Sequence, residues 1–325
     1  MHGTRRSIVL GLTAIPALLP LPRGARAQGW PERPVRIVLG LAPGGGADVV
    51  LRMLVERLRE RLGQAVIVEN LSGAGGTIAS AKVAVAQPDG YTLEAKTVSA
   101  AVVSALAYKN LPYRAVEDFQ PVSMIARAPL VAVVAQKTGV KDLDQLLALL
   151  RAEPGKHTFG SSGAGSILHL AGEMFSQSAG LQIIHVPYRG SAPALQGLLS
   201  GDITMVFDTI GNVQPQIEAG NVRAIGVASM EPTPIMPDLP PMGRVIPNFS
   251  IDTWLGLYAP AKTPKPIVNL LSRHVVDALR EPSIVQRLAA LSWEAGGSTP
   301  EAFADFWAKQ FATLGPLIER LKIQV

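Results

Sequence analysis

The chain has 325 residues, of which 48% are hydrophobic and 17% are charged. This composition supports a sizeable core in one or two domains and excludes an intrinsically disordered chain. The formal net charge is +5, but residues 1–27 hold four arginines and no acid, so the remainder carries 26 basic and 25 acidic residues, a net charge of +1. A nucleic-acid partner, which needs a basic face, is therefore not expected. The absence of cysteine excludes disulfides, thiolate nucleophiles and cysteine-ligated metals.

The N-terminal residues have the order of a signal peptide. Arg5 and Arg6 precede an apolar stretch over 8–21, and Ala25-Arg26-Ala27 follows as a cleavage site. The apolar stretch is shorter than the roughly 20 residues that a membrane span needs. Residues 4–9 also resemble a twin-arginine signal, so general secretory and twin-arginine export both stay open. We expect cleavage after Ala27 and an exported, soluble mature chain.

Residues 35–70 predict a strand, a glycine loop, a helix and a second strand. The apolar run over 35–41 is typical of a parallel strand buried on both faces. Pro43-Gly44-Gly45-Gly46 ends that strand, and from Ala47 apolar residues recur with a 3.6-residue period. Glycines just before a helix leave backbone N–H groups uncovered at its positive end, which predicts an anion site.

Strands and helices continue to alternate along the chain. Further strands are expected at 66–69, 91–95, 119–125, 130–135, 157–160, 183–186, 203–207, 223–228 and 253–259. Further helices are expected at 77–86, 142–151, 167–178, 192–199, 213–219, 266–279, 283–291 and 300–321, with a loop or short helix at 97–104. Residues 230–247 contain six prolines and predict an extended connector.

This alternation predicts an α/β fold with mostly parallel sheets. Ligands of such folds bind beyond the C-terminal ends of the strands. The glycine and serine loops fall at those ends, in two groups that suggest two lobes facing one cleft. These loops are 43–46, 73–76, 161–166 and 188–191, with Asp208-Thr209.

Phosphate and cofactor motifs are incomplete. No glycine run continues into the Lys-Ser/Thr of a P-loop, and both G-x-G runs lack the third glycine of a dinucleotide site. Asp48 would also repel a phosphate, and a capping role for it is favoured over ligand contact. We therefore expect no cofactor.

Hydrolase and metal chemistry are equally weakly supported. Residues 160–164 lack the last glycine of G-x-S-x-G, and the usual residue order leaves only His274 as a base. His169 and Glu173 are spaced as a pair on one helix but lack a third metal ligand. His157 and His185 are interpreted as structural, and no metal is expected.

The remaining interpretation is a binding site rich in small donors. Glycine and serine loops at helix N-termini supply N–H and O–H groups without a cluster of basic side chains. Arg189 is the one cation near such a loop, and ligand contact and a surface position are equally open for it. Such a site suits a small carboxylate, because each hydrogen bond to a charged acceptor contributes about 1.5–3 kcal/mol.

Motifs in a fixed order also mark a family. They are Trp30-Pro31-x-Arg33-Pro34-Val35-Arg36, Ala42-Pro43-Gly44-Gly45-Gly46-x-Asp48, Val68-Glu69-Asn70-x-x-Gly73-Ala74-Gly75-Gly76, Pro88-Asp89-Gly90-Tyr91-Thr92-Leu93, Leu111-Pro112-Tyr113 with Asp118-Phe119, Ser161-Ser162-Gly163-x-Gly165-Ser166, His185-Val186-Pro187-Tyr188-Arg189-Gly190, Phe207-Asp208, Gly256-Leu257-x-Ala259-Pro260 and Thr263-Pro264. With these motifs the chain resembles, over residues 30–325, the Bug-type substrate-binding proteins of tripartite tricarboxylate transporters.

The resemblance implies a two-lobed periplasmic binding protein, a Venus flytrap of two mostly parallel or mixed sheets. The chain would cross between lobes near Arg127–Pro129 and again near Ser250–Trp254. We accordingly expect a signal peptide over 1–27, a first lobe from 28–127 plus 252–325, and a second lobe from 128–251.

The resemblance also implies a set of ligand-binding residues. From the first lobe these are Pro43, Gly44, Gly45, Asp48, Thr97 and Ser99, and from the second Ser161, Ser162, Gly163, Ser166, Tyr188 and Asp208. The sequence departs from the family at Ala47, where Thr or Ser is frequent, at Leu41, where an aromatic is frequent, and at 101–104, which lack Ile-Asn-Pro. These departures suggest a ligand that is more apolar on one side.

The expected function is capture of a small organic carboxylate in the periplasm for membrane transporter subunits. We expect a monomer without catalytic residues. The alternatives are a sensor that hands its signal to a membrane receptor and, with less support, a carboxylate-processing hydrolase.

Overall fold

The structure, a computed structural model, describes residues 29–320. The expected signal peptide and its cleavage after Ala27 lie outside the described residues. The strands are β1 (Val35–Leu39), β2 (Val66–Asn70), β3 (Thr92–Thr97), β4 (Phe119–Ala135), β5 (Thr158–Ser161), β6 (Ile184–Pro187), β7 (Met205–Thr209), β8 (Val222–Val227), β9 (Asp252–Pro260) and β10 (Glu294–Ala295).

Helices follow most strands, as the alternating pattern predicts. The α-helices are α1 (Gly46–Leu62), α2 (Thr77–Ala84), α3 (Ser104–Ala107), α4 (Leu143–Ala152), α5 (Ile167–Ser178), α6 (Ser191–Ser200), α7 (Ile210–Glu218), α8 (Lys265–Leu279), α9 (Pro282–Ala290) and α10 (Pro300–Arg320). Short 3₁₀ helices are η1 (Ala74–Gly76), η3 (Gln136–Thr138) and η4 (Met242–Arg244), and η2 (Ser99–Val103) is a π-helix. No helix within residues 29–320 is long and apolar enough to cross a membrane.

The strands form a mixed sheet in the order β2-β1-β3-β9-β4-β7-β5-β6, with β8 and β10 also paired to β4. The pairs β1–β2, β1–β3, β5–β6 and β5–β7 are parallel. The pairs β3–β9, β4–β9 and β4–β7 are antiparallel. Helices join the parallel strands, so the expected α/β architecture with mixed sheets is confirmed.

Strand β4 is continuous, and the expectation of two separate strands at 119–125 and 130–135 was wrong. Up to Pro129 it pairs with β9, and from Leu130 it pairs with β7. Its two prolines, which donate no ladder hydrogen bond, lie where the ladder is irregular. The register shifts next to Pro121, and the partners change just after Pro129. Neither proline therefore ends the strand.

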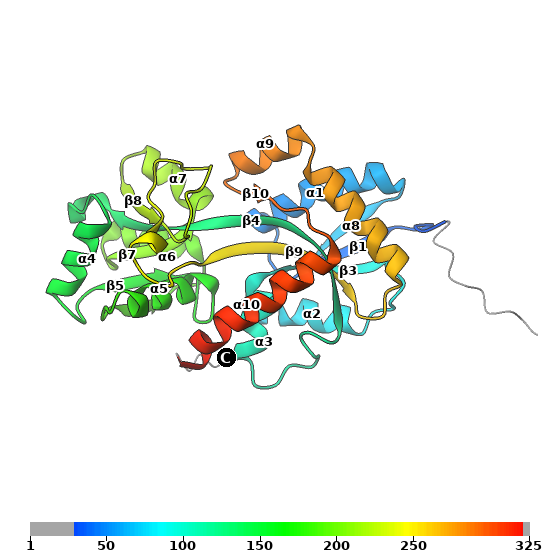
Figure 1. Ribbon diagram of the computed structural model, residues 1–325, viewed down its shortest axis with the longest axis horizontal. Coiled ribbons are helices and arrows are strands. Elements are labelled where there is room, and N and C mark those ends of the chain that lie inside the picture. The colour runs from blue at the N-terminus through cyan, green and yellow to red at the C-terminus, as the bar shows by residue number, and fades with distance from the viewer. Residues whose placement is uncertain (1–28, 321–325) are drawn as a thin grey trace, which may run out of the picture.

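Strands β4 and β9 connect two groups of elements (Figure 1). We call the group with β1–β3, α1, α2, α8 and α9 the first lobe, and the group with β5–β8 and α4–α7 the second lobe. The return connection enters β9 at Asp252, just after Ile251 N donates to Ala228 O at 2.9 Å. The two strands that join the lobes thus run side by side, in opposite directions.

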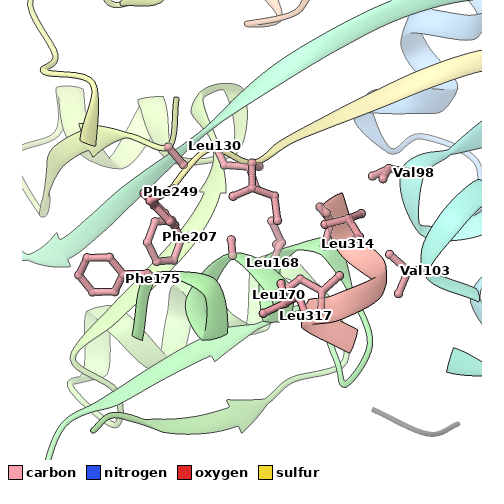
Figure 2. Packing of buried hydrophobic residues seen from close by; sticks show 14 of the residues in the cluster. Val98, Val103, Leu130, Leu168, Leu170, Phe175, Phe207, Phe249, Leu314 and Leu317 are labelled. Atoms are coloured by element: carbon pink, nitrogen blue, oxygen red, sulfur yellow. The ribbon is translucent and has the colours of Figure 1, made fainter. Parts of the chain in front are cut away.

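Helix α10 runs obliquely past the connecting strands and reaches the second lobe (Figure 1). Leu314 and Leu317 belong to the same buried cluster as Leu168 and Leu170 of α5, which lie beside them in Figure 2. Nearer its start, α10 packs on the first lobe, where the Trp307 indole N–H donates to Ala101 O at 3.1 Å. The last described helix therefore contacts both lobes.

The packing between β9 and α10 generates a prediction. A Cβ on Gly256 would lie 2.1 Å from Phe303 Cζ, so Gly256→Ala should overpack this contact and lower the free energy of unfolding by about 1–3 kcal/mol. Urea unfolding measures the change. Because the clash is with one ring, the double variant Gly256→Ala/Phe303→Leu should lose less than the sum of the two single variants. Strict additivity would contradict the proposed contact.

Candidate functional site

A cavity of about 590 Å³ lies between the lobes. The first lobe lines it with the β1–α1 loop, the end of β3 and the residues after α9. The second lobe contributes the β5–α5 loop and the first residues of α6 and α7. Five residues of the expected set line the cavity: Gly44, Thr97, Ser99, Ser162 and Asp208. Ligand cavities are commonly of this size and at such junctions.

Four helices begin at this cavity. Lining residues fall in the first turns of α1 (Gly46), α5 (Ile167), α6 (Ser191) and α7 (Gly211). The first backbone N–H groups of any helix lack an intrahelical partner, and no side chain caps those of α1, α6 or α7. Within residues 29–320 no Lys, Arg or His side chain lines the cavity. The positive partial charges at this cavity are therefore those of helix N-termini, and no cationic side chain of the described residues adds to them.

A buried carboxylate fixes the backbone of the loop before α1. Asp48 Oδ2 accepts hydrogen bonds from Gly44 N and Arg52 Nε, both at 2.9 Å, and Oδ1 accepts one from Asn70 Nδ2 at 2.8 Å. Burial alone raises the pKa of Asp48, but these hydrogen bonds outweigh burial and hold the pKa below its usual value. Asp48 does not line the cavity, and nor do Pro43 and Gly45. Asp48 instead fixes the loop that does.

The loop before α5 satisfies most of its own polar groups. Ser166 caps the helix, because its hydroxyl oxygen accepts from His169 N at 3.2 Å and its O–H donates to Gly163 O at 2.8 Å. Gly165 N donates to His169 Nδ1 at 3.1 Å. Of this loop only Ser162 lines the cavity, while Ser161, Gly163 and Ser166 shape the turn beneath it.

The fold brings together a serine and a histidine that the sequence did not suggest as a pair. Ser161 Oγ lies 2.7 Å from His185 Nε2. The hydroxyl uses its single proton to donate to Gly163 O at 3.0 Å, so His185 must be the donor to Ser161. Burial and the neighbouring His169 lower the pKa of His185 to about 4. Ser161 is fully buried and does not line the cavity, so this pair lacks the arrangement of a nucleophile and a base.

Other residues singled out from the sequence lie elsewhere. The Tyr188 ring packs over α6, where a Cβ on Gly197 would be 2.2 Å from its hydroxyl oxygen. Neither Tyr188, Arg189 nor the 73–76 loop lines the cavity. His274 is on α8, away from the serine loop. Among residues 29–320 no three His, Asp or Glu side chains are grouped so that they could hold a metal ion.

Asp208 is the buried acid of the cavity wall. Its Oδ1 accepts from Thr209 N at 2.7 Å and from Asn212 Nδ2 at 2.9 Å. Burial raises the pKa of Asp208 to about 6, because these neutral donors do not compensate fully for the lost hydration. The Asp208 carboxyl group therefore gains or loses its charge around pH 6, and it does so in the wall of the cavity.

One part of the wall was missed by sequence reasoning. Leu291 and Trp293, just after α9, line the cavity, and Leu291 O lies 2.6 Å from where a Cβ on Gly211 would be. Ser292 Oγ donates to Gln214 Oε1 at 3.4 Å, so this segment touches α7 of the second lobe. A local pattern cannot show this, because the segment is about eighty residues from α7 in sequence.

Comparisons with known proteins agree with this geometry. Residues 50–323 match the family described as the tripartite tricarboxylate transporter family receptor. The periplasmic binding protein BugD is 32% identical, covers 91% of this chain and 99% of its own, and superposes with a TM-score of 0.77. The R. palustris protein Rpa4515, solved with adipate, is 31% identical, with coverages of 89% and 97% and a TM-score of 0.81. MatC from Rhodopseudomonas palustris, solved with bound malate, is 29% identical, with coverages of 89% and 100% and a TM-score of 0.77.

The motif order in the sequence, the mixed α/β fold and these similarities point to one assignment. The family match extends over most of the chain, and the structural matches cover nearly all of each neighbour. The chain belongs to the tripartite tricarboxylate transporter family receptors and is a substrate-binding protein of the Bug type.

Proposed function

We propose that this receptor captures a small organic carboxylate in the cavity between its lobes, in the periplasm, and presents it to the membrane subunits of a tripartite tricarboxylate-type uptake system. The observation that carries the proposal is the convergence of four helix N-termini on one cavity without a cationic lining side chain in the described residues. Backbone N–H groups at helix starts favour anions, and carboxylates fit them without special chemistry.

Family neighbours support the class of ligand. Rpa4515 was solved with adipate and MatC with malate, and both are organic acids with carboxylate groups. In this chain the α1 loop comes from the first lobe and the α5, α6 and α7 starts come from the second. A carboxylate between them would contact both lobes at once.

Such bridging gives a signal that a membrane partner can detect. We propose lobes of 28–127 plus 252–325 and of 128–251, joined through β4 and β9. A ligand that contacts both lobes binds the closed form better than the open form. Shifting an open-to-closed ratio from 99:1 to 1:99 requires about 5.5 kcal/mol of preferential binding, which several hydrogen bonds to a carboxylate can supply.

The direct test is thermal unfolding of the mature chain with a panel of organic acids. A binder at 100 times its dissociation constant should add about 2.7 kcal/mol of stability and raise the melting temperature. The protein should first be unfolded and refolded to remove any co-purified ligand. If no carboxylate raises the melting temperature of the refolded protein, the receptor function is wrong.

A substitution in the α1 loop tests whether its N–H groups hold the anion. Gly45 is the N-cap of α1, with φ −74°, and a Cβ there would meet no atom within 4 Å. Gly45→Asp should therefore fold, and its carboxylate should cap the helix and occupy the ligand's N–H groups. We expect unchanged or higher stability with ligand binding reduced at least 100-fold by calorimetry. Gly45→Ala, which cannot cap, is the matched control and should still bind; normal binding by Gly45→Asp would exclude this loop as the anion site.

The raised pKa of Asp208 predicts a pH dependence of binding. Above about 6 the side chain is ionised and repels an anionic ligand, whereas at pH 5.5 it is mostly protonated. Lowering the pH from 7.5 to 5.5 should therefore strengthen binding of a carboxylate, roughly fivefold for charges about 8 Å apart in a partly screened site. Asp208→Asn keeps the oxygen that accepts from Thr209 N and should bind more tightly at pH 7.5, with a flatter profile. An equally steep profile in Asp208→Asn would assign the effect to another group.

A further inference from the structure

One indole in this protein lacks the hydrogen bond that the others make. The indole N–H groups of Trp30, Trp254 and Trp307 donate to Asp89 O, Gln310 Oε1 and Ala101 O at 3.0, 3.4 and 3.1 Å. The fourth, Trp293, has no acceptor among residues 29–320, although its side chain is only 7% exposed. Trp293 Nε1 is not among the fully buried side-chain atoms without a partner, so it is accessible to solvent or a ligand, and this accessibility needs an explanation.

The position of Trp293 supplies that explanation. Trp293 lines the cavity, and its Nε1 lies 3.5 Å from where a Cβ on Gly46 would be. Gly46 begins α1, the helix whose uncapped N-terminus faces the same cavity. The backbone N–H of Trp293 donates to Leu288 O at 2.9 Å, which fixes the residue directly after α9. The indole N–H thus lies beside the expected anion site and has no acceptor among the described residues.

Large apolar side chains surround the same region. Leu41, Val49 and Leu291 line the cavity and are 38%, 36% and 37% exposed, so their apolar surface is accessible to a ligand. The acidic side chains of the cavity wall, Asp208 and Glu218, come from the second lobe. The first-lobe wall beside α1 is therefore apolar, and the second-lobe wall adds two acids to its helix N-termini, so a second carboxylate would meet apolar groups on the first lobe and nearby acids on the second.

We propose that Trp293 is a specificity-determining residue, whose indole N–H donates to the ligand carboxylate at the start of α1. Its ring packs, with Leu41, Val49 and Leu291, against an apolar body of the ligand. The substrate class is then a monocarboxylate with an apolar body of about ring size. This inference rests on the carboxylate-receptor function proposed above and narrows its ligand.

The test compares benzoate and hexanoate with succinate by calorimetry on the refolded mature chain. The two monocarboxylates should bind at least tenfold more tightly than succinate. Trp293→Phe keeps the ring and removes the N–H, so it should weaken all three acids about tenfold, as expected for one hydrogen bond to a charged acceptor. Trp293→Ala should also reduce the preference for benzoate over succinate. Trp30→Phe, which removes an indole N–H that has a protein acceptor, is the matched control and should leave all affinities unchanged.

Two further measurements keep the outcomes distinct. Ligand should change the tryptophan fluorescence of the wild type, and this change should be largely lost in Trp293→Phe. Leu41→Asn, at an exposed position, should weaken benzoate more than succinate. Failure of every acid to bind the wild type would overturn the receptor function itself. Binding with succinate preferred, or with Trp293→Phe equal to the wild type, would overturn only the role of Trp293 and the apolar ligand.

Discussion

The proposed carboxylate site has no cationic side chain among the described residues, and much of the cavity's construction fits that constraint. Backbone N–H groups replace basic side chains, so each must point into the cavity and remain unused by the protein. This fits the glycines Gly44 and Gly46 that line the cavity where α1 begins, and the starts of α6 and α7 without side-chain caps. It also fits the arrangement of Asp48, whose carboxylate accepts a hydrogen bond from Gly44 N and leaves the following N–H groups uncovered.

Donors on separate lobes are useful only if the lobes are correctly placed. Strand β4 achieves much of this, because it is one continuous strand paired first with β9 and then with β7. Contacts on the other side of the cavity come from the segment after α9, where Leu291 lies against Gly211. The cavity therefore has a backbone connection at one side and a side-chain and loop contact at another. Hydrogen bonds of the sheet fix the connection through β4, whereas the contact of Leu291 with Gly211 can separate without breaking any strand.

Sequence reasoning located most elements because the periodicity of apolar residues and the glycines at element ends are local signals. It placed α5 at 167–178, where the structure has Ile167–Ser178, and it brought Ser162 and Asp208 to strand ends that meet at the cavity. It divided β4 into strands at 119–125 and 130–135, and only the pairing shows that Pro129 lies at a change of partners within one strand. Trp293 carries no local signal at all, since its neighbour Gly46 is nearly 250 positions away. Which of the expected ligand residues contact ligand stays a prediction.

The contacts of α10 have a consequence for the order in which the protein is completed. Leu314 and Leu317 share a buried cluster with Leu168 and Leu170, so part of the second lobe's packing depends on residues that leave the ribosome about 146 positions later. Until then α5 exposes an apolar face, which makes the partly synthesised chain prone to aggregation and slow to reach its final packing. Helix α10 thus completes the packing of a lobe that was translated long before it.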